Sequence, residues 1–218
     1  MNYRLYFLFF TYLCFSVKVF AQKSDSLFVA AKSSNLTLSY NSSLIYPGCR
    51  LGVELPIKTI FLTKTKLSGE KKEFNLDRFL TTKLSFYHHP SFHDNLYFTV
   101  GWTMRRVKLN GFFTEFSPEI GLSRTFLGGT VYKVDNNANV QIEKLAGYYY
   151  ALLSIGGGIG YDFEKIKYKP VMIFSQLNVL MLFPYNSTIY LRPTFELGCI
   201  YKPSNFLSIR NHSKSKTN

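Results

Sequence analysis

Acidic residues are scarce in this chain, which has 13 Asp and Glu against 26 Lys and Arg and a formal charge of +13. Cysteine is also scarce, with three residues in the whole chain. So few cysteines exclude a disulfide-rich scaffold, because such a scaffold needs several pairs. Beyond the N-terminal segment, no apolar run approaches the roughly 20 residues that a membrane-spanning helix requires. Any membrane span must therefore be built from strands.

The N-terminal segment MNYRLYFLFFTYLCFSVKVFAQ has the features of an export signal. Arg4 precedes an apolar run from Leu5 to Phe15, and a Val-Phe-Ala sequence ends at Ala21. This pattern suits signal peptidase, so we expect cleavage after Ala21. The run is too short for a comfortable membrane anchor. The predicted organisation is a signal peptide at 1–21, a periplasmic lead-in at 22–34, a β-barrel at 35–202 and a basic C-terminal tail at 203–218.

The stretch STIYLRPTFELGCIYKP, Ser187 to Pro203, places apolar side chains on one parity and polar side chains on the other. Since side chains of a strand point to opposite faces with a period of two, this alternation predicts a strand with one apolar face. Turn sequences such as Asn110-Gly111 separate similar segments and favour hairpins. The sequence predicts eight up-and-down strands, at Asn35–Ile45, Cys49–Leu62, Phe79–His88, Asn95–Leu109, Phe112–Phe126, Tyr148–Phe163, Pro170–Phe183 and Ser187–Lys202. It predicts no helix and a long structureless interval near Gly129 to Gln141.

A soluble barrel and a membrane barrel both alternate, so the composition of the polar face has to separate them. Here that face is mainly Gly, Ser, Thr and Tyr with single charges, whereas a strand surface facing water would carry Lys, Glu, Arg and Thr and would avoid Gly. Small residues with a few bulky or charged ones suit the crowded interior of a narrow closed barrel. The predicted class is therefore all-β, a closed antiparallel transmembrane β-barrel. The alternative is a soluble secreted β-barrel that holds an apolar ligand inside.

An eight-stranded barrel is only about wide enough inside for side chains to fill, so the predicted lumen conducts nothing appreciable. Charges inside it must pair, because an isolated buried charge is costly. The sequence predicts a lumen network made of Arg105, Glu115, Glu119, Tyr190, Arg192 and Glu196. Cys49 and Cys199 lie on apolar positions of different strands, and we expect free thiols there.

The signal ending in Phe-Ala-Gln, strands of this length and the stretch FFTEFSPEIGLSRTFLGG together resemble small outer-membrane β-barrel proteins of the Bacteroidetes kind. The resemblance covers most of the mature chain and implies the outer membrane of a Gram-negative cell. The basic charge of an exported chain favours outer-membrane lipid, with lipopolysaccharide as a candidate, as a partner, and an unidentified protein is a further candidate partner. The resemblance supplies no functional residue. Export removes nucleic acid as a partner of the basic charge.

An even number of strands predicts that both termini are periplasmic. Longer loops of such barrels usually face outward, which places His88–Asp94 and the longest loop, Leu127–Gly147, outside the cell. The basic Lys64–Lys72 connection then faces the periplasm. Arg124 lies on the apolar parity near the outward end of its strand, where it could meet a lipid phosphate. The alternative is a local bulge that turns Arg124 into the lumen.

Three weaker patterns carry candidate chemistry. His88, His89 and His93 in YHHPSFHDN could ligate a metal, but adjacent residues of an extended chain point apart, so a solvated loop is expected and no metal. Ser117, Ser123 and Ser154 could serve a lipid hydrolase with these histidines, but no spacing singles out a triad, and no enzyme is predicted. SIGGGIG, Ser154 to Gly160, lacks the lysine of a phosphate loop, so its glycines are interpreted as lumen clearance and no cofactor is expected.

Overall fold

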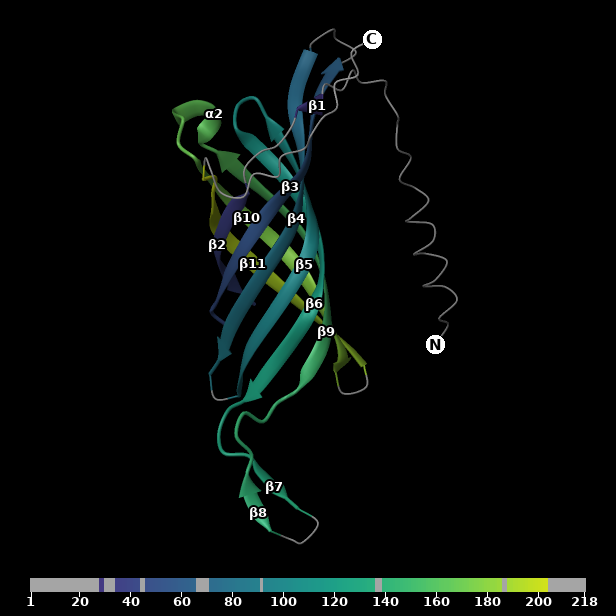
Figure 1. Ribbon diagram of the computed structural model, residues 1–218, viewed down its shortest axis with the longest axis vertical. Helices are drawn as coiled ribbons and strands as arrows, with labels where there is room; N and C mark the ends of the chain where they lie inside the picture. Colours follow the sequence, from purple (N-terminus) through teal and green to yellow (C-terminus); the bar gives the residue numbers. More distant parts are fainter. Residues whose placement is uncertain are drawn as a thin grey trace, which may run out of the picture.

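The computed structural model describes residues 28–29, 34–43, 46–65, 71–90, 92–135, 139–185 and 188–203. Eight antiparallel strands in it close into a ring, each hydrogen-bonded to two neighbours (Figure 1). The order around the ring is β3-β2-β11-β10-β9-β6-β5-β4, and β4 pairs back with β3. This confirms the predicted all-β, eight-stranded closed barrel. The strands are β2 (Asn35–Ser42), β3 (Gly48–Thr65), β4 (Lys71–His89), β5 (His93–Lys108), β6 (Phe112–Leu127), β9 (Tyr149–Asp162), β10 (Val171–Tyr185) and β11 (Thr188–Tyr201).

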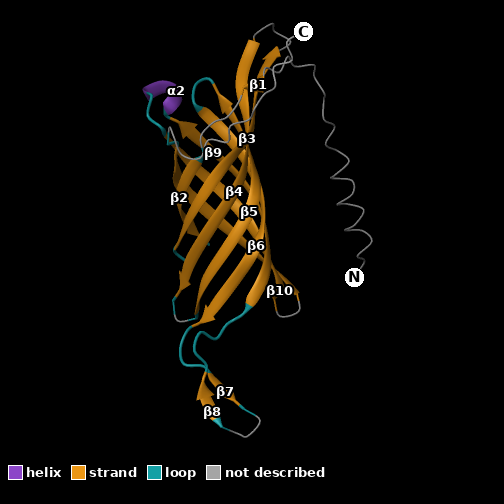
Figure 2. Ribbon diagram, in the orientation of Figure 1, coloured by secondary structure: helices purple, strands orange, loops and turns teal. Residues whose placement is uncertain are grey.

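Four small elements of the described chain lie outside the eight-stranded ring that the sequence predicted. The interval near Gly129 to Gln141 is not structureless, because β7 (Tyr132–Val134) and β8 (Val140–Ile142) pair as a hairpin that projects beyond the barrel (Figure 2). A short strand, β1 (Phe28–Val29), pairs with β3 beyond the start of β2. A four-residue helix, α2 (Glu164–Lys167), connects β9 to β10, where no helix was predicted.

The barrel has two distinct ends, which Figure 1 shows at the top and the bottom. The α2 end carries α2 and the β5–β6 turn, and there β2 begins and β11 ends. The hairpin end carries the β7–β8 hairpin together with the turns from β2 to β3, from β4 to β5 and from β10 to β11. The signal peptide predicted at 1–21 and all but Pro203 of the tail predicted at 203–218 lie outside the described residues.

Strands β3 and β4 are the longest of the ring, with 18 and 19 residues. They pair as far as Thr65 and Lys71, so the predicted Lys64–Lys72 connection is wrong as a loop except at 66–70, which the structure does not describe. A register shift between Pro56 and Lys58 marks a β-bulge. The buried parity of β3 changes there, from Glu54 before the bulge to Thr59 after it. A bulge inserts one unpaired residue, which is why the alternation reverses.

Two of the other strand prolines, Pro118 and Pro193, also lie where strand pairing is interrupted or ends. The β5–β6 ladder runs from Gly101 opposite Glu119 to Met104 opposite Phe116, and Pro118 lies in the gap between these pairs. Pro193 lies in β11 before the first residue that pairs with β2, Phe195. Since proline has no N–H to donate, these are positions that a closed barrel tolerates.

The barrel is apolar outside and polar inside. Large hydrophobic side chains stand exposed on every strand of the ring, for example Leu122 on β6 and Leu177 on β10. Among the described residues, the buried set is dominated by polar and charged side chains. Cys49 and Cys199 are free thiols on the apolar outer parity, as predicted. No helix in the described part of the chain is long and apolar enough to cross a membrane.

Candidate functional site: a sealed lumen and a tyrosine-lined cup

The middle of the lumen is filled by two groups of ion pairs. In one, Arg105 contacts Glu54 at 2.7 Å and Glu115 at 2.8 Å. In the other, Arg50 contacts Glu119 at 2.6 Å and Glu196 at 2.9 Å, and Lys83 contacts Glu119 at 2.8 Å. All of these side chains are almost fully buried. Each carboxylate meets a cation in the buried interior, where leaving one partner alone is costly.

Hydroxyl and amide groups complete the network. Ser39 donates to Glu196 at 2.6 Å, Thr99 donates to Glu119 at 2.9 Å and Asn35 donates to Glu54 at 2.8 Å. Bonds to charged groups are among the stronger hydrogen bonds of proteins. The network therefore joins side chains from β2, β3, β4, β5, β6 and β11 across the barrel.

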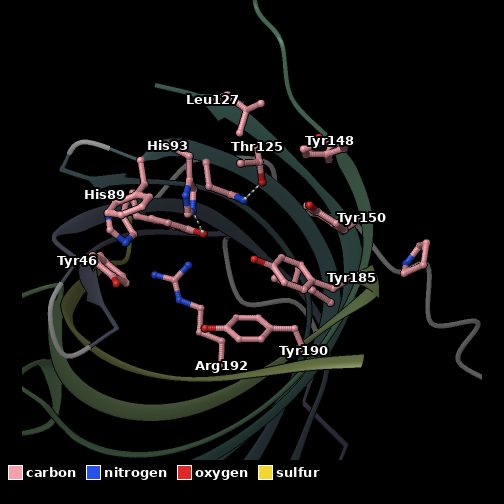
Figure 3. Close-up of a pocket in the computed structure, with 15 residues that line it drawn as sticks. Tyr46, His89, His93, Thr125, Leu127, Tyr148, Tyr150, Tyr185, Tyr190 and Arg192 are labelled. Carbon is pink, nitrogen blue, oxygen red and sulfur yellow. Dashed lines mark hydrogen bonds between the residues drawn. The ribbon is translucent and has the colours of Figure 1, made fainter. Parts of the chain in front are cut away.

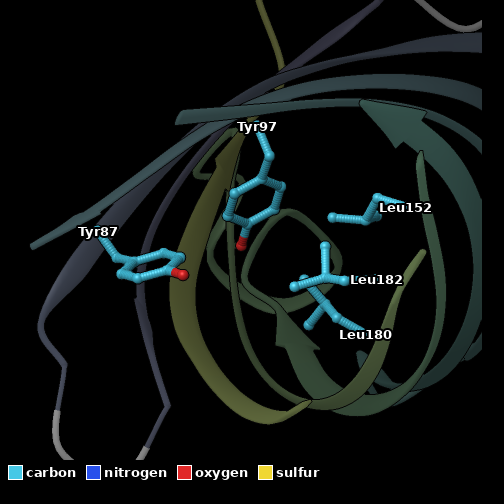
Figure 4. Close-up of a cluster of buried hydrophobic side chains, with 5 residues drawn as sticks. All are labelled: Tyr87, Tyr97, Leu152, Leu180 and Leu182. Carbon is cyan, nitrogen blue, oxygen red and sulfur yellow. The ribbon is translucent and has the colours of Figure 1, made fainter. Parts of the chain in front are cut away.

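Two clusters of buried apolar side chains flank the ion pairs. Tyr87, Tyr97, Leu152, Leu180 and Leu182 form the cluster nearer the hairpin end (Figure 4). Tyr97 lies 5.7 Å from the Arg50 guanidinium and so links this cluster to the network. Val107, Phe113, Met172, Phe174 and Ile200 form the second cluster, and Phe113 lies 5.2 Å from the Arg105 guanidinium. The ion pairs therefore lie between two layers of buried apolar side chains.

The structure brings four of the six predicted lumen residues into this network, namely Arg105, Glu115, Glu119 and Glu196. It places Tyr190 and Arg192 elsewhere, at the hairpin end. Arg50, Glu54 and Lys83 are members that the sequence analysis missed. The alternation along β3 indicates that Arg50 and Glu54 point inward. Alternation alone does not indicate which charged side chains contact each other across the barrel.

The cup is a cavity of about 480 Å³ in the mouth of the barrel at the hairpin end (Figure 3). Aromatic side chains make most of its wall, and it contains no acidic residue. Tyr150, Tyr185 and Tyr190 form one side, with ring centroids 5.3 Å apart for the first pair and 4.8 Å for the second. The remaining lining residues are Tyr46, Tyr87, His89, Phe92, His93, Asn95, Thr125, Leu127, Tyr148, Leu182, Pro184 and Arg192.

Arg192 is the one arginine of the cup lining, and its side chain points into the cavity (Figure 3). Its guanidinium lies 3.6 Å from the centroid of the Tyr87 ring and 5.5 Å from that of Tyr46. Arg192 is only 6% exposed, and its Nε has no hydrogen-bond partner. Within the described residues no ion pair joins it to a carboxylate. The cup therefore has a buried positive charge facing aromatic walls.

The histidines of the β4–β5 turn divide between two faces. His88 points outward and its Nδ1 lies 2.5 Å from Asp94. His89 and His93 face the cup, where His89 stacks on Tyr46 and His93 Nε2 lies 3.4 Å from the Tyr87 hydroxyl. Among the described residues, no group of three His, Cys, Asp or Glu side chains is arranged to hold a metal.

Ser117, Ser123 and Ser154 are all buried in the lumen. Ser117 bonds to Thr103 at 2.9 Å, Ser123 donates to Asn95 at 2.9 Å and the Ser154 hydroxyl has no partner. Thus none of these three hydroxyls bonds to a histidine. Of the glycines in SIGGGIG, Gly156 faces inward, and a Cβ there would lie 2.1 Å from atoms of Gln176 and Asn178. The absence of a side chain at Gly156 therefore leaves room in the lumen for Gln176 and Asn178.

Arg124 is on the outer parity of β6, opposite Leu96 of β5 and Tyr149 of β9. The β5–β6 register is continuous around it, so no bulge turns it into the lumen. Its Nη2 donates to the carbonyl of Leu145 at 2.8 Å, and its guanidinium lies 4.1 Å from the Tyr149 ring centroid. It therefore has local partners in the chain that follows the β7–β8 hairpin.

No family model matches this chain, and no curated protein matches its sequence. Solved structures that are similar to it include the following two. Neisserial surface protein A is 13% identical with a TM-score of 0.36, over 82% of this chain and 99% of that protein. The β domain of the Bordetella autotransporter BrkA is 14% identical with a TM-score of 0.34, over 79% of this chain and 70% of that domain. The likeness extends no further than the fold.

Proposed function

We propose that this protein is an outer-membrane β-barrel with a sealed lumen that acts by binding at its rim. The observation that carries the proposal is the inversion of polarity, with apolar side chains exposed around the ring and ion pairs buried within it. A water-soluble barrel would expose its charged side chains and bury its apolar ones. In a membrane the apolar band faces lipid, and closure of the ring leaves no unpaired strand edge.

Aromatic side chains at both ends of the apolar band support this proposal. Tyr149 and Phe183 are exposed near the hairpin end, and Tyr201 is exposed near the α2 end. Also near the α2 end, the Arg106 guanidinium lies 3.8 Å from the Phe74 ring centroid and Lys108 Nζ lies 4.8 Å from that of Phe112. Aromatic rings and long basic side chains are typical of membrane interfaces.

The proposed orientation places the α2 end in the periplasm and the hairpin end outside the cell. The longest connection between ring strands, which contains β7 and β8, is at the hairpin end, and outward loops of such barrels are usually the longer ones. A Gram-negative source of the Bacteroidetes kind is part of the proposal and rests on the sequence resemblance. The partners proposed are outer-membrane lipid, including lipopolysaccharide, and a protein that contacts the rim.

The proposal includes no catalytic step, because the three candidate serines lie in the lumen and bond to Thr103, to Asn95 or to nothing. A soluble barrel with an apolar ligand inside is disfavoured by the lumen itself. Its centre carries Arg50, Lys83 and Arg105 with their carboxylates, and an apolar ligand there would have to displace them.

Reconstitution into liposomes and planar bilayers tests this function. We expect the protein to co-float with liposomes after extraction at high pH, and to show no stable conductance steps. A refolded sample should also migrate differently before and after boiling in electrophoresis, as folded membrane barrels do. Protein that stays in the aqueous fraction would contradict the membrane assignment, and steady porin-sized steps would contradict the sealed lumen.

A further inference from the structure

We infer that the cup binds an acidic sugar unit, a ring that carries a carboxylate or a phosphate, and that Arg192 is the residue that holds the anion. The inference deepens the proposed binding role of the rim and rests on it. The unexplained feature is the charge on Arg192, which is 6% exposed. A buried cation is costly without a partner, and the described residues supply no carboxylate to it.

The other buried arginines of the lumen show what Arg192 lacks. Arg50 and Arg105 each meet two carboxylates at 2.9 Å or less. Arg192 instead has the faces of Tyr87 and Tyr46 and a hydrogen bond with the Tyr87 side chain, and its Nε has no partner. These contacts with tyrosines offset part of the cost of a buried cation, but they supply no anion to its N–H donors. Those donors form a planar fork that matches a carboxylate or a phosphate.

The rest of the cup favours an anion over a cation. The lining contains Arg192, His89 and His93 and no acidic residue. Asp94, the nearest acid in sequence to these histidines, is held by His88 on the outer face. Electrostatic complementarity therefore selects negative ligands, and it excludes cationic ones by repulsion.

The walls favour a ring with hydroxyl groups. Tyr185 and Tyr190 are stacked and Tyr150 is tilted against Tyr185, and each of the three carries a phenol hydroxyl that donates or accepts. A sugar ring has apolar C–H faces and a rim of hydroxyl groups, which match such walls. The cavity of about 480 Å³ is within the range of small-molecule sites, roughly 300–1,000 Å³. The opening at the hairpin end leaves it accessible from outside the barrel.

Isothermal titration calorimetry of the full chain, refolded in a zwitterionic detergent, tests this site. The probes are glucuronate, glucose 6-phosphate and, as a neutral match, glucose. We expect both anions to bind and glucose to bind at least tenfold more weakly, because it lacks the partner of Arg192. Arg192→Gln should weaken both anions at least tenfold. Arg106→Gln removes the same charge from the outer wall near the α2 end and should change neither affinity.

A second pair of variants covers the case in which Arg192→Gln fails to fold. Tyr185→Ala and Tyr190→Ala remove partly exposed rings from the wall and should each weaken glucuronate several-fold in a protein that still shifts on boiling. A further arm adds lipopolysaccharide to the micelles. Competition with glucuronate would assign the sugar to a lipid-borne source, and unchanged binding would assign it to a free or polymeric one.

Failure of both anions to bind the wild-type protein would overturn the inference, as would equal binding by Arg192→Gln. Either result in a protein that still inserts into liposomes and conducts nothing leaves the proposed barrel function intact. Loss of insertion, in contrast, overturns the proposed function itself. The two failures are thus distinguished by the liposome assay.

Discussion

Arg105 on β5 and Glu54 on β3 form a pair of hydrogen bonds past the intervening strand β4. Arg105 Nη1 donates to Glu54 Oε2 at 2.9 Å, and Nη2 donates to Oε1 at 2.7 Å. This is a two-pronged pair, the geometry in which arginine and a carboxylate interact most specifically. Arg105 also donates from Nε to Glu115 at 2.9 Å. One guanidinium therefore joins β3, β5 and β6 inside the barrel, and its removal leaves two carboxylates without their cation.

The first prediction compares the loss of Arg105, which pairs with two carboxylates, with the loss of one of those carboxylates, Glu54. Arg105→Met should destabilise the folded barrel by about 3–5 kcal/mol, because it leaves buried charge uncompensated. Glu54→Gln should cost about 1–3 kcal/mol, since Arg105 keeps Glu115. Urea unfolding of the refolded protein, followed by the shift in electrophoretic mobility, measures both values. Equal costs for the two variants would show that Arg105 does not hold the two carboxylates together.

A pair of adjacent glycines tests the filled lumen by size. A Cβ at Gly156 would lie 2.1 Å from atoms of Gln176 and Asn178, whereas a Cβ at Gly157 would have no atom within 4 Å. Gly156→Leu should therefore destabilise the barrel by at least about 1–3 kcal/mol through overpacking. Gly157→Leu should leave the unfolding midpoint unchanged or raise it, because it adds an apolar side chain to the lipid face. Equal tolerance of the two variants would mean that the lumen has room to spare.

The cup should bind anions more tightly as the pH falls. Burial, assisted by the nearby charges of His89 and Arg192, holds the pKa of His93 at the rim below its usual value. His93 is therefore less protonated near pH 7 than an ordinary histidine, and its protonation at lower pH adds positive charge to the cup. Asp94 opposes the shift but points to the outer face. Glucuronate affinity, measured by calorimetry from pH 7.5 to pH 5.5, should rise several-fold.

His93→Gln is the matched variant for this pH dependence. It keeps a polar side chain of similar size and should reduce the rise, while His88→Gln on the outer face should leave the rise intact. A rise of the same size in His93→Gln would place the titrating group elsewhere. An affinity that falls with acidification would contradict the sign of the effect.

Arg124 should stabilise the chain that follows the β7–β8 hairpin. Its bond to the Leu145 carbonyl and its contact with Tyr149 fix this segment against the barrel. Arg124→Gln should therefore increase the rate of trypsin cleavage after Lys144 several-fold, measured by mass spectrometry on intact liposomes. An unchanged rate, together with loss of lipopolysaccharide binding, would instead favour the lipid-phosphate role predicted for Arg124 from the sequence.

The class of fold could be predicted because alternation, turn residues and the composition of the polar face all constrain the same property. The Asn110-Gly111 turn and the strand ends near it are cases where local chemistry was sufficient. The reversal of parity after Pro56 could not be derived from the sequence, because one extra residue reverses parity without changing composition. The β7–β8 hairpin was missed since each strand has three residues, too few for a period to be recognised.

The site was predicted less completely than the fold. The alternation of side chains along each strand indicated that charged residues such as Arg105 and Glu196 point inward. It could not indicate how far along the barrel axis each residue lies. Arg192 shares its parity with Glu196 on β11 and lies four residues away, yet it belongs to the cup and Glu196 belongs to the ion pairs. Only the tilt and register of the ring separate these two roles.

The central claim is that the apolar outer wall faces lipid, and a nitroxide scan along β10 tests it most directly. Single spin labels would replace Gln176, Leu177, Asn178 and Val179 in a variant without Cys49 and Cys199, reconstituted in liposomes. We expect Leu177 and Val179, which are exposed, to collide with oxygen and not with a water-soluble nickel chelate. Gln176 and Asn178, which are buried, should be shielded from both. Outward positions that collide preferentially with the nickel chelate would contradict the membrane barrel.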